Sequence, residues 1–183
     1  SDCLCADGKN RQGIIEISTA NSFAAIGSVI NANTTNYFLD NNQIDGTRTT
    51  TLTSATETAV VSAFTVALPE DRGSFTWNGN FIRKYVSGNN TPYLADDEYR
   101  LTGSANGLNT KGKDYNIEIT DTLQIQLGCR WIKGGVLAIS STSIKNKATL
   151  EYGDGTCDNK ALLKYGKKER TITQVCYLST IRF

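Results

Sequence analysis

The sequence predicts an all-β fold, an antiparallel sandwich or meander of about 10–13 short strands stabilised by disulfides. Three observations support this prediction. Apolar and polar residues alternate with a period of two over much of the chain. Turn signals recur about every 8–12 residues, a spacing typical of antiparallel sheets. The five cysteines have no zinc-site spacing, which favours disulfides.

The strands are assigned from alternation and from β-branched and aromatic content. Residues 113–126 alternate most clearly, with Tyr115, Ile117 and Ile119 on one face and Asn116 and Glu118 on the other. The expected strands are residues 13–18, 36–40, 47–58, 58–66, 75–77, 81–86, 97–107, 113–126, 129–132, 135–140, 147–152, 160–165 and 170–175.

Four sequence signals place turns between these strands. Asn41-Asn42 and Asp45-Gly46 are turn dipeptides, Asn78-Gly79 predicts a type I′ hairpin, and Gly166-Lys167 predicts a tight turn near the end of the chain. Residues 22–29 are apolar and only weakly periodic, and we expect a single helical turn there.

Composition excludes several classes of function. The chain has 183 residues, 39% of them hydrophobic, and no low-complexity linker, so we expect a single domain over residues 1–183. The net charge of +1 lacks the basic excess of a nucleic-acid-binding protein, and no apolar run is long enough to predict a transmembrane segment. Without histidine a Ser-His-Asp triad is impossible. We expect no catalytic residues and no cofactor, and therefore no enzyme.

The cysteines and the start of the chain indicate export. The chain starts at Ser1 and contains no Met, which favours a form from which a signal peptide has been removed. Disulfides form in oxidising compartments, so we expect a secreted protein of the extracellular cell surface. Five is an odd number, so one thiol is free, pairs with another chain or has lost its partner.

Most of the chain, and most specifically its last third, resembles a family of secreted or lipid-anchored proteins of Bacteroidota. The resemblance is carried by residues 129–135 and by residues 148–161, which match the family's "LDYGDGTCDNKA" stretch. Residues 36–39 with 45–47 resemble the family's "NYYVN…EGT" segment, and residues 97–103 with 116–119 also fit. The resemblance covers most of residues 5–174 and implies a fold and a location, because the family is functionally uncharacterised.

The chain departs from the family's pattern at both ends. Family members carry an additional strand before the first cysteines and stop near the position of Gln174, whereas this chain adds residues 175–183. A missing first strand exposes a sheet edge that a neighbouring subunit's strand could fill, as in bacterial pili assembled by donor-strand addition. The candidate donor strand carries Val175, Tyr177, Ser179, Ile181 and Phe183 at alternate positions. The alternative is an ordinary last strand within its own domain.

Two disulfides are expected, Cys129–Cys157 and a bridge from Cys176 to either Cys3 or Cys5. The glycine-rich loop that contains Cys157 also carries oxygen ligands that suit Ca²⁺. These weak metal candidates are Asp154, Asp158 and Asn159. Their spacing misses the calcium-loop pattern, so we favour a turn held by the disulfide.

Three further groups of residues are weighed as sites. Asp96, Asp97 and Glu98 are the densest acidic cluster, but adjacent strand residues point to opposite faces, so a solvated loop is favoured over paired catalytic carboxylates. Asp121-Thr122-Leu123 matches a short O-glycosylation pattern of Bacteroidota, with Thr122 as the acceptor. A sugar-stacking platform could be formed by Trp77, Tyr85, Tyr93, Tyr99 and Trp131.

The sequence therefore favours a non-enzymatic structural protein of the cell surface. We expect a subunit of an extracellular fibre or pilus-like polymer assembled by strand addition, whose partners are copies of itself. The alternative is a carbohydrate- or surface-binding module, similar to a lectin or adhesin, whose partners are surface glycans.

Overall fold

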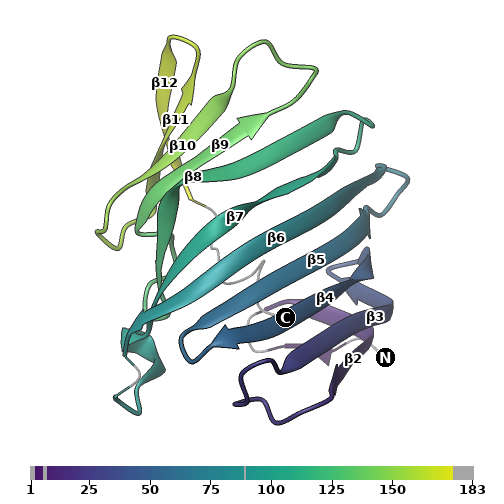
Figure 1. The fold of residues 1–183 in the computed structure, drawn as a ribbon. Helices are drawn as coiled ribbons and strands as arrows, with labels where there is room; N and C mark the ends of the chain where they lie inside the picture. The colour runs from purple at the N-terminus through teal and green to yellow at the C-terminus, as the bar shows by residue number, and fades with distance from the viewer. Residues whose placement is uncertain (1–2, 6–7, 89, 175–183) are drawn as a thin grey trace. The chain divides into compact units, whose positions relative to one another are not determined.

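The fold is an antiparallel β-meander. The structure, a computed structural model, describes residues 3–5, 8–88 and 90–174, which form twelve strands, one short 3₁₀ helix and no α-helix. The strands follow one another in the sheet in sequence order, from β1 to β12 (Figure 1). The all-β prediction is confirmed, and of its two forms the structure has the meander.

The elements are β1 (Cys3–Leu4), β2 (Asn10–Thr19), β3 (Val29–Leu39), β4 (Asn42–Ser54), β5 (Glu57–Ala67), β6 (Ser74–Ser87), η1 (Leu94–Asp96), β7 (Glu98–Leu108), β8 (Asp114–Gln126), β9 (Gly134–Ser140), β10 (Ala148–Asp154), β11 (Lys160–Tyr165) and β12 (Lys168–Thr173).

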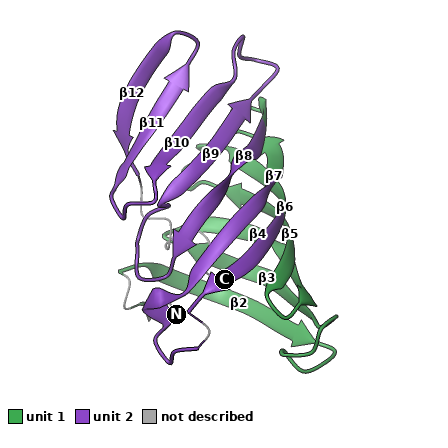
Figure 2. Cartoon of the chain, turned by 60° about the vertical axis from the view of Figure 1, so that its left-hand side comes forward, with its two compact units in different colours: residues 1–80, 105–115 green, residues 81–104, 116–183 purple. Residues whose placement is uncertain are grey.

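The chain divides into two compact units, coloured separately in Figure 2. Unit 1 contains the described residues up to Asn80 together with Ala105–Tyr115. Unit 2 contains Phe81–Ser104 and the described residues from Asn116 onwards. Each unit is described by itself below.

Unit 1 has a small core formed by cross-strand neighbours. Tyr37 of β3 lies opposite Ile44 of β4, and these two residues are 5% and 7% exposed. On β5 the buried Ser62 hydroxyl accepts a hydrogen bond from the Trp77 indole at 3.2 Å. The polar end of the half-buried Trp77 is therefore satisfied.

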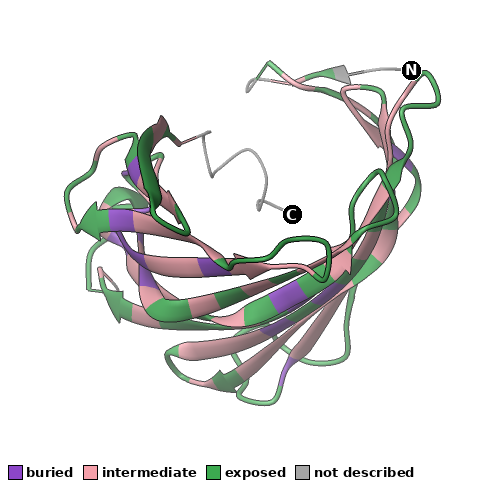
Figure 3. Cartoon of the chain, turned by 90° about the horizontal axis from the view of Figure 1, so that it is seen from above, coloured by how far each residue is buried: buried purple, intermediate pink, exposed green. Residues whose placement is uncertain are grey.

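Unit 2 has a continuous apolar cluster on one face of its strands. Its buried members are Leu123, Ile132, Tyr152 and Ala161. Partly buried side chains extend it along cross-strand pairs, Ile119 opposite Leu137 and Leu137 opposite Leu150. Buried positions are few along the strands and most are flanked by more exposed ones, as a half-buried sheet requires (Figure 3).

The hairpin predicted at Asn78-Gly79 is wrong. Both residues lie inside the 14-residue strand β6, and Gly79 is buried. A type I′ turn needs positive φ at both central residues, and neither residue has it. The strand propensity of the aromatic residues on either side, with burial of this position, outweighs the local turn signal.

The turn predicted at Asp45-Gly46 is also wrong, because both residues lie within β4. The chain reverses at Asp40 and Asn41, one residue before the position predicted from Asn41-Asn42, and the two residues adopt φ values of +48° and +64°. Gly46 allows β4 and β5 to approach each other closely, because a Cβ atom on Gly46 would lie 2.2 Å from the Ala63 carbonyl oxygen. Glycine here marks backbone proximity rather than a turn.

Two further expectations need correction. Residues 129–132 form the loop between β8 and β9 and not a strand. The helical turn expected at residues 22–29 is replaced by two turns, in which the Ala25 amide donates to Ser22 and the Ser28 amide donates to Ala25. By contrast, the tight turn at Gly166-Lys167 is confirmed, with Tyr165 paired to Lys168.

Candidate functional site

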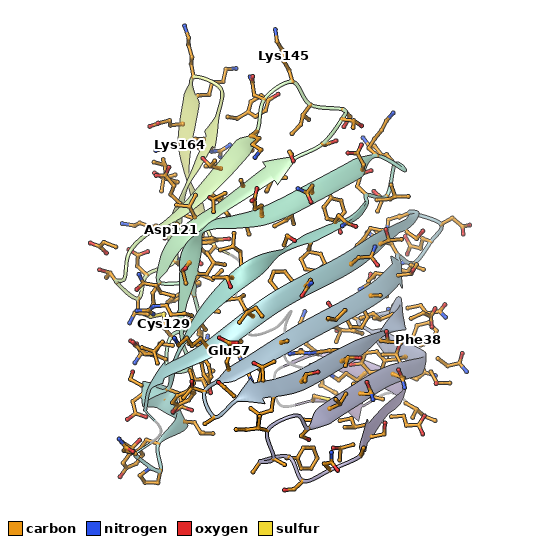
Figure 4. All side chains as sticks on the ribbon, viewed as in Figure 1. Phe38, Glu57, Asp121, Cys129, Lys145 and Lys164 are labelled. Atoms are coloured by element: carbon orange, nitrogen blue, oxygen red, sulfur yellow. A yellow bond between two sulfur atoms is a disulfide. The ribbon has the colours of Figure 1, made fainter. Side chains whose placement is uncertain are left out.

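The glycine-rich loop after β10 is held by a disulfide and by hydrogen bonds. Cys129 and Cys157 form a disulfide with Cα atoms 5.8 Å apart, as the sequence predicts (Cys129 is labelled in Figure 4). The Asp154 carboxylate accepts hydrogen bonds from the Thr156 amide and hydroxyl, which lower the pKa of Asp154. Asp158 accepts a hydrogen bond from the Lys160 amide at 2.8 Å.

The three weak metal candidates are not brought together as a ligand set. Asp154 and Asp158 each accept hydrogen bonds from residues two positions further along the chain, which is the geometry of an Asx turn. The backbone carbonyl of Asn159 accepts a hydrogen bond from the Gln174 amide at 2.7 Å. Within the described residues, no group of three or more acidic, histidine or cysteine side chains is placed to hold a metal ion.

Gln174 fastens the end of the described chain to this loop. Its side-chain oxygen accepts a hydrogen bond from the Ile132 amide at 3.0 Å. Its side-chain nitrogen donates to the carbonyls of Ile132 and Lys160, both at 3.0 Å. The last described residue is therefore anchored to the loops that the Cys129–Cys157 disulfide joins.

The acidic cluster at residues 96–98 is separated by the structure. Asp96 accepts hydrogen bonds from the Thr91 hydroxyl, and Glu98 lies 3.1 Å from the Lys133 ammonium. Asp97 is 6% exposed, so the expectation of a solvated loop is wrong for this residue. The three side chains have different partners because Asp96 ends η1, Asp97 caps it and Glu98 begins β7. They do not form a carboxylate pair.

Asp97 instead fastens the connection between β6 and β7. It accepts hydrogen bonds from the Tyr85 hydroxyl at 2.6 Å and the Tyr99 hydroxyl at 3.5 Å. Burial and the Asp97 hydrogen bond raise the pKa of Tyr85 above its usual range. A Cβ atom on Gly88 would lie 2.5 Å from an Asp97 carboxylate oxygen, so only glycine fits there.

The aromatic residues do not form one platform. Trp77 is half-buried in unit 1, and the other four aromatic candidates belong to unit 2. Tyr85 and Tyr99 contact each other edge to face with centroids 4.9 Å apart. Tyr93, by contrast, is 72% exposed in the loop before η1. It is the one member of the set that is open to a ligand.

A shallow, open depression of about 520 Å³ lies over β8, β9 and β10 in unit 2. Its acidic lining residues are Asp121, labelled in Figure 4, Glu151 and Asp154. Glu151 is paired with Lys164 at 2.7 Å, which raises the pKa of Lys164 and neutralises part of the charge. Each acid except Asp121 therefore has a protein partner here.

Thr122, the predicted O-glycosylation acceptor, lies at a register shift of β8. It is half-buried and precedes Leu123, which is 2% exposed. The backbone of Gly135 in β9 lies close to Thr122, since a Cβ atom on Gly135 would lie 2.4 Å from the Thr122 carbonyl oxygen. Glycosylation of Thr122 remains a prediction.

The outer edge of β2 in unit 1 was expected only from the family resemblance, as the edge left by a missing first strand, and the alternation pattern did not locate it. β1 pairs only with Asn10 and Arg11, so in the described part of the chain no strand covers the outer side of residues 12–19. Ile14 and Ile17 on this edge are 61% and 62% exposed. The local pattern does not mark this edge, because isoleucines on both faces of a strand are typical of a strand buried on both faces.

The other end of the meander has a different character. No described strand pairs with the outer side of β12, but that strand carries Lys168, Glu169 and Arg170. Charged side chains on an edge strand disfavour pairing with another chain. Of the two edges, only β2 has the apolar composition of an edge that accepts a strand.

The candidate donor residues Val175, Tyr177, Ser179, Ile181 and Phe183 lie outside the described residues, as does Cys176. The pairing of Cys176 with Cys3 or Cys5 stays a prediction. Comparison with family models, with curated proteins and with solved structures found no match. None of the described helices has the length and hydrophobicity needed to span a membrane.

Proposed function

We propose that this chain is a non-enzymatic structural protein of the cell surface, a subunit of an extracellular fibre or pilus-like polymer that assembles by strand addition. The observation that carries the proposal is the open edge of β2. Residues 12–19 have no partner on their outer side among the described strands, and two of their isoleucines are more than half exposed.

An edge of this kind favours strand addition for two physical reasons. The backbone N–H and C=O groups on the outer side of a sheet edge form a row that an added strand can pair with. A strand added there also covers part of the isoleucine side chains, and apolar burial contributes roughly 25 cal/mol per Å². Backbone pairing gives affinity and side-chain complementarity gives specificity.

The disulfide supports the proposed extracellular setting. The Cys129–Cys157 bond closes the loop to which Gln174 is attached, and disulfides persist in oxidising compartments such as the bacterial periplasm and the cell surface. The segment that follows Gln174 is the candidate donor. It therefore starts from a covalently stabilised part of unit 2.

A glycan-binding module is the second candidate function. It is favoured by Tyr93, an aromatic side chain that is 72% exposed and free to stack on a sugar ring. Binding on a glycan array that is lost in Tyr93→Ala, but kept in a Tyr165→Ala control of another exposed tyrosine, would favour this alternative.

The test of the polymer is deletion of residues 175–183. Negative-stain microscopy and light scattering of the full chain should show fibres or a ladder of oligomers, and the deleted chain should be a monomer. A synthetic peptide of residues 175–183 should bind the deleted chain. Circular dichroism and mapping of the Cys129–Cys157 bond control for folding. A full chain that is a monodisperse monomer at all concentrations would contradict the proposal.

A further inference from the structure

We propose that the acceptor is the outer edge of β2 and that residues 179–183 of a second copy pair with it antiparallel, with Arg182 opposite Glu16. This register rests on the proposed function and specifies the interface between subunits. It follows from the length of the open edge, from its side chains and from the charges of the two segments.

The open edge fits a short strand. Among the described strands, only β1 covers the outer side of β2, at Asn10 and Arg11, and it leaves eight residues, 12–19, without a partner there. On the inner side β3 holds residues 14–19 in one continuous register, with Ile17 opposite Ala32 and Thr19 opposite Ile30, while Gly13 forms a bulge at φ +99°. The backbone of residues 14–19 is therefore already extended before a partner arrives, which lowers the entropy lost on pairing.

The two segments are complementary in charge. Glu16 is the only charged side chain in residues 12–19, and it is exposed. Arg182 is the only charged side chain in residues 175–183. Opposite charges directly across a strand pair stabilise it, and like charges destabilise it. This single pair therefore selects one register.

The same register also matches the neighbouring positions. Ile181 lies opposite Ile17, and Phe183 lies opposite Ile15, so two apolar pairs flank the charged pair. Thr180 and Ser179 then lie opposite Ser18 and Thr19, which are hydroxyl pairs of the kind found across strands. A shift of one residue places Arg182 opposite an isoleucine and moves each side chain to the other face.

The antiparallel direction follows from β1. In the parallel direction, aligning Arg182 with Glu16 would pair residues 179–183 with residues 13–17, which include the bulge at Gly13, and would point the connection from Gln174 back towards Arg11, a position already paired with Cys3. The antiparallel direction uses residues 15–19, which pair with β3 without a register shift, and it points the connection away from β1. It also leaves residues 175–178, including Cys176, outside the pairing as a tether from Gln174.

The test is a charge exchange in the full chain. Glu16→Arg and Arg182→Glu should each weaken association of the subunits by roughly three- to tenfold, measured by sedimentation over a concentration series. The double variant Glu16→Arg/Arg182→Glu should restore it. Asp45→Arg is the matched control, because it reverses an exposed acid on the interior strand β4 of the same unit and should have no effect.

A second pair of variants tests the edge independently of the charge pair. Ile17→Lys places a charge on the edge and should abolish assembly. Val61→Lys, on the interior strand β5 with Val61 52% exposed, should not. Circular dichroism checks that both variants fold.

The outcomes separate this register from the proposed function. If deletion of residues 175–183 abolishes assembly but the charge variants do not affect it, or the double variant fails to restore it, the register is overturned and the polymer stands. If the unaltered chain is monomeric throughout, both are overturned. Mixing differently tagged copies tests the second-copy origin: tags that never co-purify would contradict it.

Discussion

Removal of the Cys129–Cys157 disulfide gives the most quantitative test of the structure. The bond joins residues 28 positions apart, and the chain-entropy relation for a loop of that length gives about 3.6 kcal/mol at 25 °C. For a chain of this size each kcal/mol corresponds to roughly 2–4 °C, so the midpoint of thermal unfolding should fall by about 7–14 °C.

The assay is thermal and urea unfolding of Cys129→Ala/Cys157→Ala compared with the unaltered chain, with and without reductant. Cys129 is 4% exposed, so the double variant also loses some packing, which reduced wild-type protein retains. Reductant would also break a bridge from Cys176, so the effect of reductant on wild type minus its effect on the double variant isolates the Cys129–Cys157 cross-link. A midpoint in reduced wild type that equals the oxidised one would refute the reasoning, because the loop would then be held by its other contacts alone.

Three further predictions follow from individual contacts. Gln174→Ala removes three side-chain hydrogen bonds of about 3.0 Å and should lower the free energy of unfolding in urea by about 2–3 kcal/mol. Gln43→Ala is the control: it loses one exposed hydrogen bond to Asp45 and should lower the free energy of unfolding by under about 1 kcal/mol. Tyr85→Phe leaves the buried Asp97 carboxylate without its 2.6 Å donor and should lower the free energy of unfolding by roughly 1–3 kcal/mol in chemical denaturation. An unchanged midpoint would contradict the role given to Asp97. The hydrogen bond from Lys9 lowers the pKa of Asp40 below 3.8, so this interaction stabilises the fold above that pH and the stabilisation is lost on acidification. An NMR titration should show the lowered pKa of Asp40. Asp40→Asn should make the free energy of unfolding fall less steeply with decreasing pH.

Much of the strand assignment could be read from local alternation. Residues 113–126 alternate as expected, because a half-buried sheet requires apolar side chains on one face only. The tight turn at Gly166-Lys167 was also predictable, since it depends on only four consecutive residues. Where local signals and neighbouring strands agree, the sequence alone is sufficient.

Local turn signals failed where a neighbouring strand decided the conformation. Asn78-Gly79 and Asp45-Gly46 are turn dipeptides in isolation, yet both lie inside long strands. Gly46 is required by the Ala63 carbonyl across the sheet, a contact that no local pattern reveals. The same limit applies to Asp97. In the sequence it belongs to an acidic run that predicts a solvated loop, but in the structure it is buried and accepts a hydrogen bond from Tyr85.

The sequence by itself determined an all-β chain and the alternation of its faces, because these depend on residues close together along the chain. It did not determine the order of the strands or which strand lies at an edge. Those depend on pairing between distant segments, such as the two residues of β1 that cover only the first part of β2. Only the tertiary structure therefore shows that Ile14 and Ile17 lie on an open edge, where side chains that alternation would assign to a core are left in water.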